Sequence, residues 1–304
     1  MHPASGLRSS GMAAWVLAGL AALAGLVAAL WWAWRSTGEP DARLVYKQVG
    51  GHSLQLHVFH ARGQAGSGSQ QPPAALLLFH GGGWAHGHAS QFYPQCRQLS
   101  QLGITCISVE YRIASRHGST PADAVDDAHD ALRWVRSQAR SLRIDAERVA
   151  AGGGSAGGHL AAALGVGLRR PGRLAGAEHG GDSLGAGPGT RPAALLLLNP
   201  MLDLSPGQPD HMLVAPYWHS VSPMHHVAQG VPPTLVLSGT DDPEVPVNTL
   251  QTFCERLLRS GTPCELQLFP GGRHGFFNPQ VDSGRHYLPA LRSMRDFLQR
   301  QGLL

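Results

Sequence analysis

The sequence predicts an α/β domain with a mostly parallel sheet of eight strands and helices on both faces. From residue 75 onward, short apolar runs alternate with longer stretches of helical pattern, and this alternation is typical of such a sheet. Before it, residues 43–59 carry a hairpin signal. The chain has 304 residues, of which 43% are hydrophobic and 14% charged. This composition allows one large domain and excludes a mostly disordered chain.

The elements follow in order along the chain. Two strands, residues 43–48 and 53–59, are joined by Gly50-Gly51, which favours a tight turn. The remaining strands are expected at residues 75–79, 104–110, 147–152, 193–198, 234–239 and 264–269. The helices are expected at residues 91–102, 121–140, 156–166, 246–260 and 285–300. Residues 170–192 are rich in glycine and proline and are expected to form a surface loop.

An uncharged segment, residues 12–34, precedes this domain. As a helix of about 23 residues it would span about 35 Å, enough for a bilayer core of about 30 Å. Trp31, Trp32 and Trp34 lie at one end, where an interfacial aromatic belt belongs. We therefore predict a tail (1–11), a transmembrane or signal-anchor helix (12–34), a linker (35–42) and the folded α/β domain (43–304).

A cleaved signal peptide is the alternative reading of this segment. Ala22-Leu23-Ala24 resembles a cleavage site, but cleavage there would leave an apolar stretch, residues 25–34, at the new terminus. An uncleaved anchor is therefore favoured. One arginine precedes the segment and three basic residues follow it by residue 47, so the positive-inside count does not favour export.

The strongest chemical signal is the sequence Gly153-Gly154-Ser155-Ala156-Gly157. It lies between an expected strand and an expected helix, the context that a G-x-S-x-G nucleophile elbow requires. Small residues two positions either side of Ser155 would let the strand and the helix approach each other. A glycine-rich turn that happens to contain serine is the plainer alternative, and the strand–turn–helix context disfavours it.

A nucleophilic serine needs a histidine base and a carboxylate that orients the base. Asp241 and Asp242 follow the strand at 234–239, and His274 follows the strand at 264–269. The order serine, acid, histidine is the order expected for this fold type, and ligand sites of α/β sheets lie at such strand ends. These residues indicate acyl transfer.

The sequence His80-Gly81-Gly82-Gly83-Trp84 directly follows the strand at 75–79. Ordering three consecutive glycines is costly, so a function is expected for them. Attack on an acyl carbon places negative charge on the carbonyl oxygen, which needs backbone N–H donors about 3 Å away. We predict that Gly82, Gly83 and the amide of Ala156 form this oxyanion hole.

Together, five ordered motifs carry a family resemblance: HGGGW, SVEYR, GGSAGG, GTDDPEVP and RHGFFN. Over residues 45–300 the chain resembles the α/β-hydrolase fold. Within it, the chain is similar to the hormone-sensitive-lipase-like branch of esterases and lipases, close to bacterial acetyl-esterase or acetyl-xylan-esterase-like proteins. The resemblance implies Ser155 as nucleophile, His274 as base and Asp242 as acid. Asp242 is preferred to Asp241 because the family places proline after the acid. No cofactor is implied.

The substrate is expected to be a small-molecule or carbohydrate ester with a short, acetyl-sized acyl group. Lipase-type members of the branch carry a substantial helical cap, whereas here only residues 199–233 separate two strands. A small cap offers little apolar wall to a long acyl chain. Trp84, Tyr217 and Trp218 are candidates for lining the pocket, although ordinary packing explains them equally well. The natural alcohol and the oligomeric state stay open.

Four cysteines occur in two pairs with the same spacing, Cys96 with Cys106 and Cys254 with Cys264. In each pair the first member falls on an expected helix and the second on the following strand. Two disulfides would indicate an oxidising compartment, whereas four buried thiols are the alternative. With the apolar segment, these pairs lead us to expect a membrane-anchored domain outside the cytoplasm.

Other functions find less support in the sequence. His86, His88, His225 and His226 lack further ligands at useful spacing, so no metal site is expected. No arginine cluster alternates with aromatic residues, which disfavours nucleic-acid binding. An amide hydrolase, formamidase-like or peptidase, would use the same triad and remains an alternative. A non-catalytic binding protein of this fold would typically have lost a triad member.

Overall fold

The computed structural model describes residues 38–62, 71–168 and 190–304. Contacts divide the chain into residues 1–39 and residues 40–304, and all elements below belong to the second unit. The predicted helix at 12–34 and most of the predicted loop at 170–192 lie outside the described residues. Within the described ranges, no helix is both long and apolar enough to cross a bilayer.

The predicted eight-stranded, mostly parallel sheet is confirmed. Its order is β1-β2-β4-β3-β5-β6-β7-β8. Within this described sheet only β2 is antiparallel to its neighbours, and all the other strands run in the same direction. The strands are β1 Ala42–Val49, β2 His52–Phe59, β3 Ala75–Phe79, β4 Thr105–Val109, β5 Val149–Gly154, β6 Leu195–Leu198, β7 Thr234–Gly239 and β8 Cys264–Phe269.

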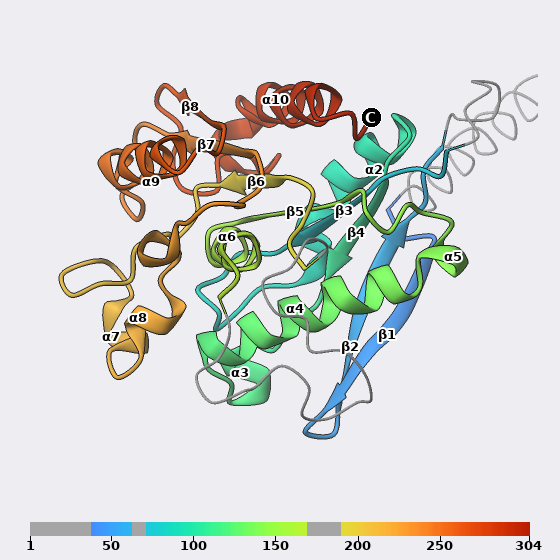
Figure 1. Cartoon of the computed structure of the whole chain (residues 1–304), viewed down its shortest axis with the longest axis horizontal. Helices are drawn as coiled ribbons and strands as arrows, with labels where there is room; N and C mark the ends of the chain where they lie inside the picture. Colours follow the sequence, from blue (N-terminus) through green and yellow to red (C-terminus); the bar gives the residue numbers. More distant parts are fainter. Residues whose placement is uncertain (1–37, 63–70, 169–189) are drawn as a thin grey trace, which may run out of the picture. The chain divides into compact units, whose positions relative to one another are not determined.

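Side chains of the central strands alternate between two apolar layers. In β3, Leu77 and Phe79 join the layer on one face, and Leu76 and Leu78 join the layer on the other. This two-residue period is the geometry of an extended strand that is buried on both faces. The sheet is therefore the middle of three layers (Figure 1).

Five longer helices cover the two faces close to where the sequence predicts them. The first layer includes α4 (Pro121–Ser137), α6 (Ala156–Val166) and α9 (Val247–Arg259), and the second includes α2 (Tyr93–Gln101) and α10 (Tyr287–Arg300). Helix α4 begins at a capping box in which Thr120 and Asp123 each satisfy a backbone N–H of the other. The short helices α3 (Ala114–His117) and α5 (Ala139–Leu142) were not expected from the sequence.

A small cap connects β6 to β7. It contains only the short helices α7 (His211–Val214), α8 (Trp218–Val221) and η2 (Pro223–His226), and in Figure 1 it lies below and to the left of the sheet. Tyr217 and Trp218 are partly buried against the layer that contains α6. The cap therefore packs on the same side of the sheet as the helix that follows Ser155.

The structure joins the cysteines in the same two pairs that the spacing suggests. Cys96 on α2 is bonded to Cys106 on β4, with Cα atoms 5.0 Å apart. Cys254 on α9 is bonded to Cys264 on β8, with Cα atoms 5.3 Å apart. Both Cα separations lie within the usual range for disulfides. Each bond ties a covering helix to the strand that follows it.

Candidate active site

Ser155 occupies a strained turn between β5 and α6. Its backbone has φ 55° and ψ −120°, an unusual conformation for a residue other than glycine. The turn is held on both sides, because Ser155 N–H donates to the carbonyl of Leu198 (2.9 Å) and its own carbonyl accepts from His159 N–H (3.0 Å). Such strain persists only where the surroundings fix it, as at a nucleophile elbow.

The two motif glycines allow the elbow to pack against β3. A Cβ atom on Gly157 would lie 1.9 Å from the carbonyl oxygen of Phe79. A Cβ atom on Gly153 would lie 2.5 Å from that same oxygen and from the carbonyl of Gly157. No side chain fits at either position without moving backbone. The sequence-based reason for small residues two positions either side of Ser155 therefore agrees with the packing.

The structure brings Ser155, His274 and Asp242 together at the carboxyl ends of β5, β8 and β7. His274 Nε2 lies 3.0 Å from Ser155 Oγ, and His274 Nδ1 lies 3.0 and 2.9 Å from the two carboxylate oxygens of Asp242. The Asp242 side chain is fully buried. Its Oδ1 also accepts the N–H groups of Glu244 (2.8 Å) and Val245 (3.1 Å). These bonds hold the carboxylate in place.

Asp241 lies outside this arrangement. It is exposed, and its carboxylate accepts a hydrogen bond from Thr240 Oγ1 (2.8 Å) rather than from His274. Glu244 comes nearer, because its Oε2 lies 3.3 Å from His274 Nε2. That contact is an ion pair only when the imidazole is protonated, and the Glu244 side chain is 58% exposed, so water screens it.

The glycine loop after β3 runs beside the elbow. A Cβ atom on Gly81 would lie 3.4 Å from Ser155 Cβ, so the loop passes close to Ser155. The N–H of Gly81 already donates to Gln91 Oε1 (2.7 Å). Gly82 and Gly83 follow with φ 117° and 59°, conformations that favour glycine.

Across from this loop, Ala156 is the first residue of α6. An N–H in the first turn of a helix has no acceptor within the helix, so it can donate to another group. Ala156 directly follows Ser155, and Gly82 and Gly83 belong to the loop beside it. That the three amides form the oxyanion hole stays a prediction.

Comparison with known proteins places this arrangement in a family. Residues 76–217 match a family described as the α/β hydrolase fold, and residues 205–301 match the prolyl oligopeptidase family. The propionate-bound structure of esterase 2 from Thermogutta terrifontis is 34% identical, with a TM-score of 0.73, covering 86% of this chain and 95% of that one. The chain belongs to the α/β-hydrolase esterase and lipase family.

The matches to two curated relatives cover only part of each relative. Esterase LipC of Mycobacterium tuberculosis is 31% identical over 67% of this chain and 53% of LipC. Ethyl acetate hydrolase of Pseudomonas putida is 43% identical over 41% of this chain and 39% of that protein. The chain thus spans about half the length of LipC.

Among the pocket candidates, Trp84 requires a correction. Its side chain is only 2% exposed, and it packs edge-on against His159 with ring centres 5.0 Å apart. Burial in the core, rather than contact with substrate, explains this tryptophan.

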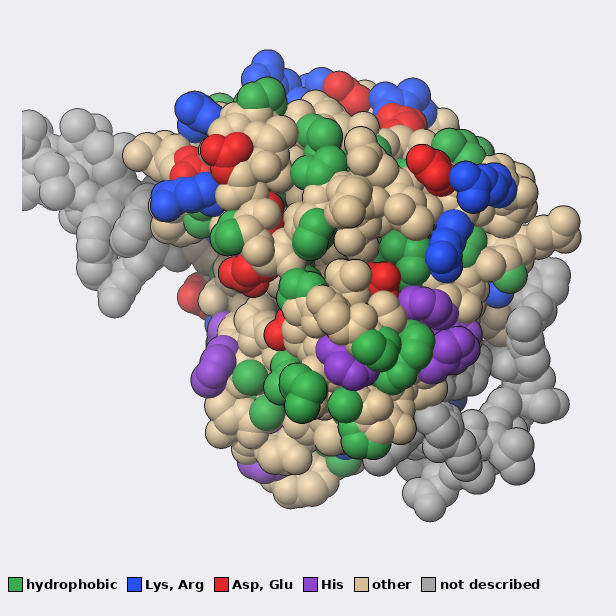
Figure 2. Space-filling model, turned by 90° about the vertical axis from the view of Figure 1, so that its left-hand side faces the viewer, with side chains coloured by type: hydrophobic (Ala, Val, Ile, Leu, Met, Phe, Trp, Pro, Cys, Tyr) green, Lys and Arg blue, Asp and Glu red, His purple; other side chains and the backbone are tan. Residues whose placement is uncertain are grey.

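Trp218 packs among histidines of the cap. Its ring meets those of His211, His219 and His225 edge-on, with ring centres 5.0 to 6.3 Å apart. Figure 2 views the side on which α7 and α8 lie and shows histidines gathered close together there. The Tyr217 hydroxyl donates to the carbonyl of Leu213 (3.5 Å), one helical turn earlier in the cap.

A shallow pocket of about 330 Å³ opens beside His274. Besides His274 it is lined by Pro243, Arg273, Gln280 and Val281, so neither Tyr217 nor Trp218 contributes to its wall. Arg273 is paired with Asp282 (Nε to Oδ1, 2.8 Å), which offsets its charge. In the cap, burial raises the pKa of Asp210, while the charge of His274 acts in the opposite direction. The Asp210 carboxyl group is therefore close enough to His274 to interact with it electrostatically.

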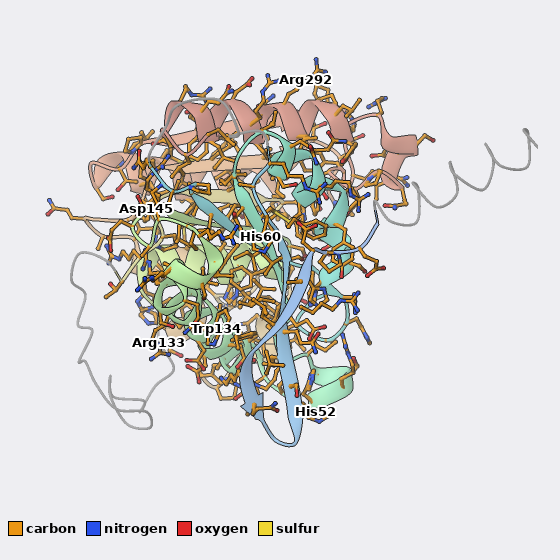
Figure 3. The ribbon with its side chains drawn as sticks, turned by 90° about the vertical axis from the view of Figure 1, so that its right-hand side faces the viewer. His52, His60, Arg133, Trp134, Asp145 and Arg292 are labelled. Atoms are coloured by element: carbon orange, nitrogen blue, oxygen red, sulfur yellow. A yellow bond between two sulfur atoms is a disulfide. The ribbon has the colours of Figure 1, made fainter. Side chains whose placement is uncertain are left out.

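A second pocket, of about 490 Å³, lies at the other edge of the sheet. It is lined by residues that precede β3 and begin β4, including Pro73 and Thr105, and by His60 (Figure 3). Ser155, Asp242 and His274 follow the carboxyl ends of the parallel strands, so this pocket is remote from them. Within the described residues no group of three or more His, Cys, Asp or Glu side chains is placed to hold a metal ion.

Asn199 is a site residue that the sequence analysis missed. It directly follows β6, is buried, and has φ 35°. Its Nδ2 lies 3.4 Å from His274 Nδ1 and 3.3 Å from Nε2, and its Oδ1 accepts the N–H of Gly275 (3.2 Å). Asn199 therefore supports the imidazole and its loop. A polar residue at the carboxyl end of a buried strand was the available signal.

Proposed function

We propose that the protein is a serine carboxylic-ester hydrolase acting on esters with short acyl groups. The observation that carries this proposal is the continuous path of hydrogen bonds from Ser155 Oγ through His274 to the buried Asp242 carboxylate. Esterases similar to this chain, and its membership of their family, support the same activity.

The geometry suits a two-step mechanism. Ser155 Oγ attacks the ester carbonyl while His274 Nε2 takes the hydroxyl proton, and Asp242 stabilises the imidazolium through Nδ1–H. The N–H groups of Gly82, Gly83 and Ala156 stabilise the oxyanion. Collapse of the tetrahedral intermediate releases the alcohol, which takes the proton from Nε2. Water activated by His274 then hydrolyses the acyl-enzyme and frees the carboxylic acid and Ser155.

Two observations support short acyl groups. The cap between β6 and β7 contains only three helices of four residues each, and the pocket beside His274 is shallow. Solved structures of the similar Thermogutta esterase carry propionate or butyrate, both short carboxylates. An acetyl-sized or slightly longer acyl group, on a small or carbohydrate alcohol, is the substrate class that we propose.

Amide hydrolysis is the second candidate. The match to the prolyl oligopeptidase family covers residues 205–301 and so includes Asp242 and His274 but not Ser155. A panel of p-nitrophenyl esters, aryl formamides and peptide anilides separates the two activities. Rates on an amide that exceed those on every ester would favour the second candidate.

Ser155→Ala tests the nucleophile directly. It should lower kcat for p-nitrophenyl acetate by at least about 1000-fold, because losing a triad member costs several orders of magnitude. A fluorophosphonate probe should label the natural protein but not this variant; the similar Thermogutta esterase is phosphorylated by paraoxon. Ser53→Ala, beside His52 at the end of the β1–β2 ribbon (Figure 3), is the control. Retention of a tenth of the natural activity by Ser155→Ala would refute the assignment.

A further inference from the structure

His159 is buried one helical turn after Ser155, and both of its ring nitrogens are engaged. Its side chain is fully inaccessible to solvent. Trp84 Nε1 lies 3.3 Å from Nδ1, and the carbonyl oxygen of Val221 lies 2.6 Å from Nε2. An indole N–H can only donate and a carbonyl can only accept. Nδ1 must therefore be the unprotonated nitrogen, and Nε2 must carry the proton.

These two bonds join the three segments that surround the nucleophile. Trp84 directly follows Gly82 and Gly83 of the glycine loop, and His159 belongs to α6, which begins at Ala156. Val221 is the last residue of α8 in the cap. The glycine loop and the cap are thus held to the same imidazole, which is itself fixed to the elbow through the bond from His159 N–H to the Ser155 carbonyl (3.0 Å).

Trp84 has the conformation of a residue held in place by its partners. Its φ is 56°, which is costly for a bulky side chain. Its carbonyl accepts the N–H of Ala114 (2.9 Å), and its indole is buried against the imidazole. Gly82 and Gly83 directly precede Trp84 and have no side chains of their own to fix their position. A shift of the indole would therefore also move their backbone amides.

We propose that His159 is a positioning residue that sets the oxyanion loop through Trp84 and the cap through Val221, each through a different ring nitrogen. The proposal deepens the proposed esterase function, since it assigns alignment of the oxyanion donors to one bond and placement of the cap to the other. Burial lowers the pKa of His159 to about 4, which keeps the imidazole in the neutral form that this pair of bonds requires.

Two substitutions separate the two bonds. An asparagine side chain places its amide near the position of Nδ1, so His159→Asn can keep the Trp84 bond and loses the Val221 bond. A glutamine reaches the position of Nε2, so His159→Gln can keep the Val221 bond and loses the Trp84 bond. His159→Leu fills a similar volume and loses both.

We expect a split in the kinetics on p-nitrophenyl acetate and butyrate. His159→Gln should lower kcat by about 10-fold with little change in KM, because oxyanion donors act mainly on the transition state. His159→Asn should keep kcat within about 3-fold, raise KM and change the acetate-to-butyrate preference. Trp84→Phe should reproduce the kcat loss and add little to His159→Gln, since both remove the same bond.

A merely structural role would produce a different pattern. The Asn, Gln and Leu variants would then lose activity in proportion to their loss of Tm, with the same division between kcat and KM, and this result would overturn the proposal. A kcat of the Trp84→Phe variant equal to that of the natural protein would also overturn the proposal.

The indole ¹H–¹⁵N resonance of Trp84, identified by its absence in Trp84→Phe, gives a readout that does not depend on ester turnover. It should shift in His159→Gln and stay in place in His159→Asn, and equal shifts in both variants would contradict the assignment of the bonds. Absence of fluorophosphonate labelling in the natural protein would instead refute the proposed esterase function.

Discussion

Asp241 and Asp242 are adjacent in the chain, but their carboxylates have opposite surroundings. Asp242 is buried, accepts two backbone N–H groups and lies 2.9 Å from His274 Nδ1. Asp241 is exposed and bonded to Thr240. The difference arises because the chain turns after β7, so the first aspartate faces solvent and the second faces the histidine loop.

Asp242→Asn should therefore lower kcat by about 10³- to 10⁴-fold, because the amide cannot hold the imidazole in the required tautomer. Asp241→Asn should change kcat less than about 3-fold. The two variants carry the same chemical change one residue apart, so each is the matched control of the other. Steady-state kinetics on p-nitrophenyl acetate measures both, and a reversed order of effects would mean that Asp241 is the acid.

Glu244 is a second carboxylate close to His274, and the effect of its removal can be compared with that of Asp242. Its carboxylate lies 3.3 Å from His274 Nε2 but is largely exposed. A screened contact of this kind is worth less than about 1 kcal/mol. Glu244→Gln should therefore change kcat/KM by less than about 5-fold, and a loss as large as that of Asp242→Asn would show that the exposed carboxylate is the functional acid.

Sequence alone predicts the triad candidates and the glycine loop because their chemistry needs particular residue types at particular strand ends. It does not predict Asn199 or the partners of His159. Asn199 and His274 lie 75 positions apart in the chain, and Trp84 and His159, which share a hydrogen bond, are also 75 positions apart. Contacts between residues so far apart produce no periodic pattern in the local sequence, so only the folded structure identifies them.

At the scale of elements, strand and helix positions follow from apolar runs and helical periodicity, whereas the cap does not. Each helix of the cap has four residues, barely more than one turn. A pattern repeating every 3.6 residues cannot be recognised in so short a segment. The sequence predicts only that the cap is small, from the spacing of its flanking strands.

The small cap leads to a prediction about acyl length. Helices α7 and α8 have only four residues each, which leaves little room for a wall along a long acyl chain. Activity on p-nitrophenyl esters should fall from acyl chains of two to four carbons to chains beyond about eight. Measuring kcat/KM across that series checks the prediction, and a higher value for the dodecanoyl than for the acetyl ester would contradict it.

At the scale of the whole molecule, buried histidines couple stability to pH. Burial lowers the pKa of both His80 and His159 from 6.5 to about 4. Burial also lowers the pKa values of His88, His117 and His225. Between pH 6.5 and about 4, the unfolded chain binds protons that the folded chain does not. Stability should therefore be full above pH 6.5 and should fall as pH decreases through this window.

Each of the two most buried histidines should contribute a loss on the order of 3 kcal/mol by pH 4, at about 1.4 kcal/mol per pH unit. Urea unfolding of the full chain at pH 7.5, 6.0 and 4.5 measures the effect. His159→Gln removes one titrating group, so its stability should decline less steeply over the same range. A free energy of unfolding that stays constant between pH 7 and 4.5 would contradict the prediction.

The location of the domain is the last prediction. We propose that residues 12–34 anchor the chain in a membrane and that the catalytic domain lies outside the cytoplasm. The two disulfides of the structure support export, because such bonds persist in oxidising compartments. The positive-inside count opposes it by only two charges, and that count has less influence on large translocated domains.

Two measurements on cells that make the protein decide between the compartments. Alkylation without reduction, followed by mass analysis, should find no free thiol at Cys96, Cys106, Cys254 or Cys264. Protease added outside intact spheroplasts should digest the domain, while a cytoplasmic marker stays intact. Free thiols together with full protection from protease would place the domain in the cytoplasm, where the same triad could still work, because ester hydrolysis requires only water as its second substrate.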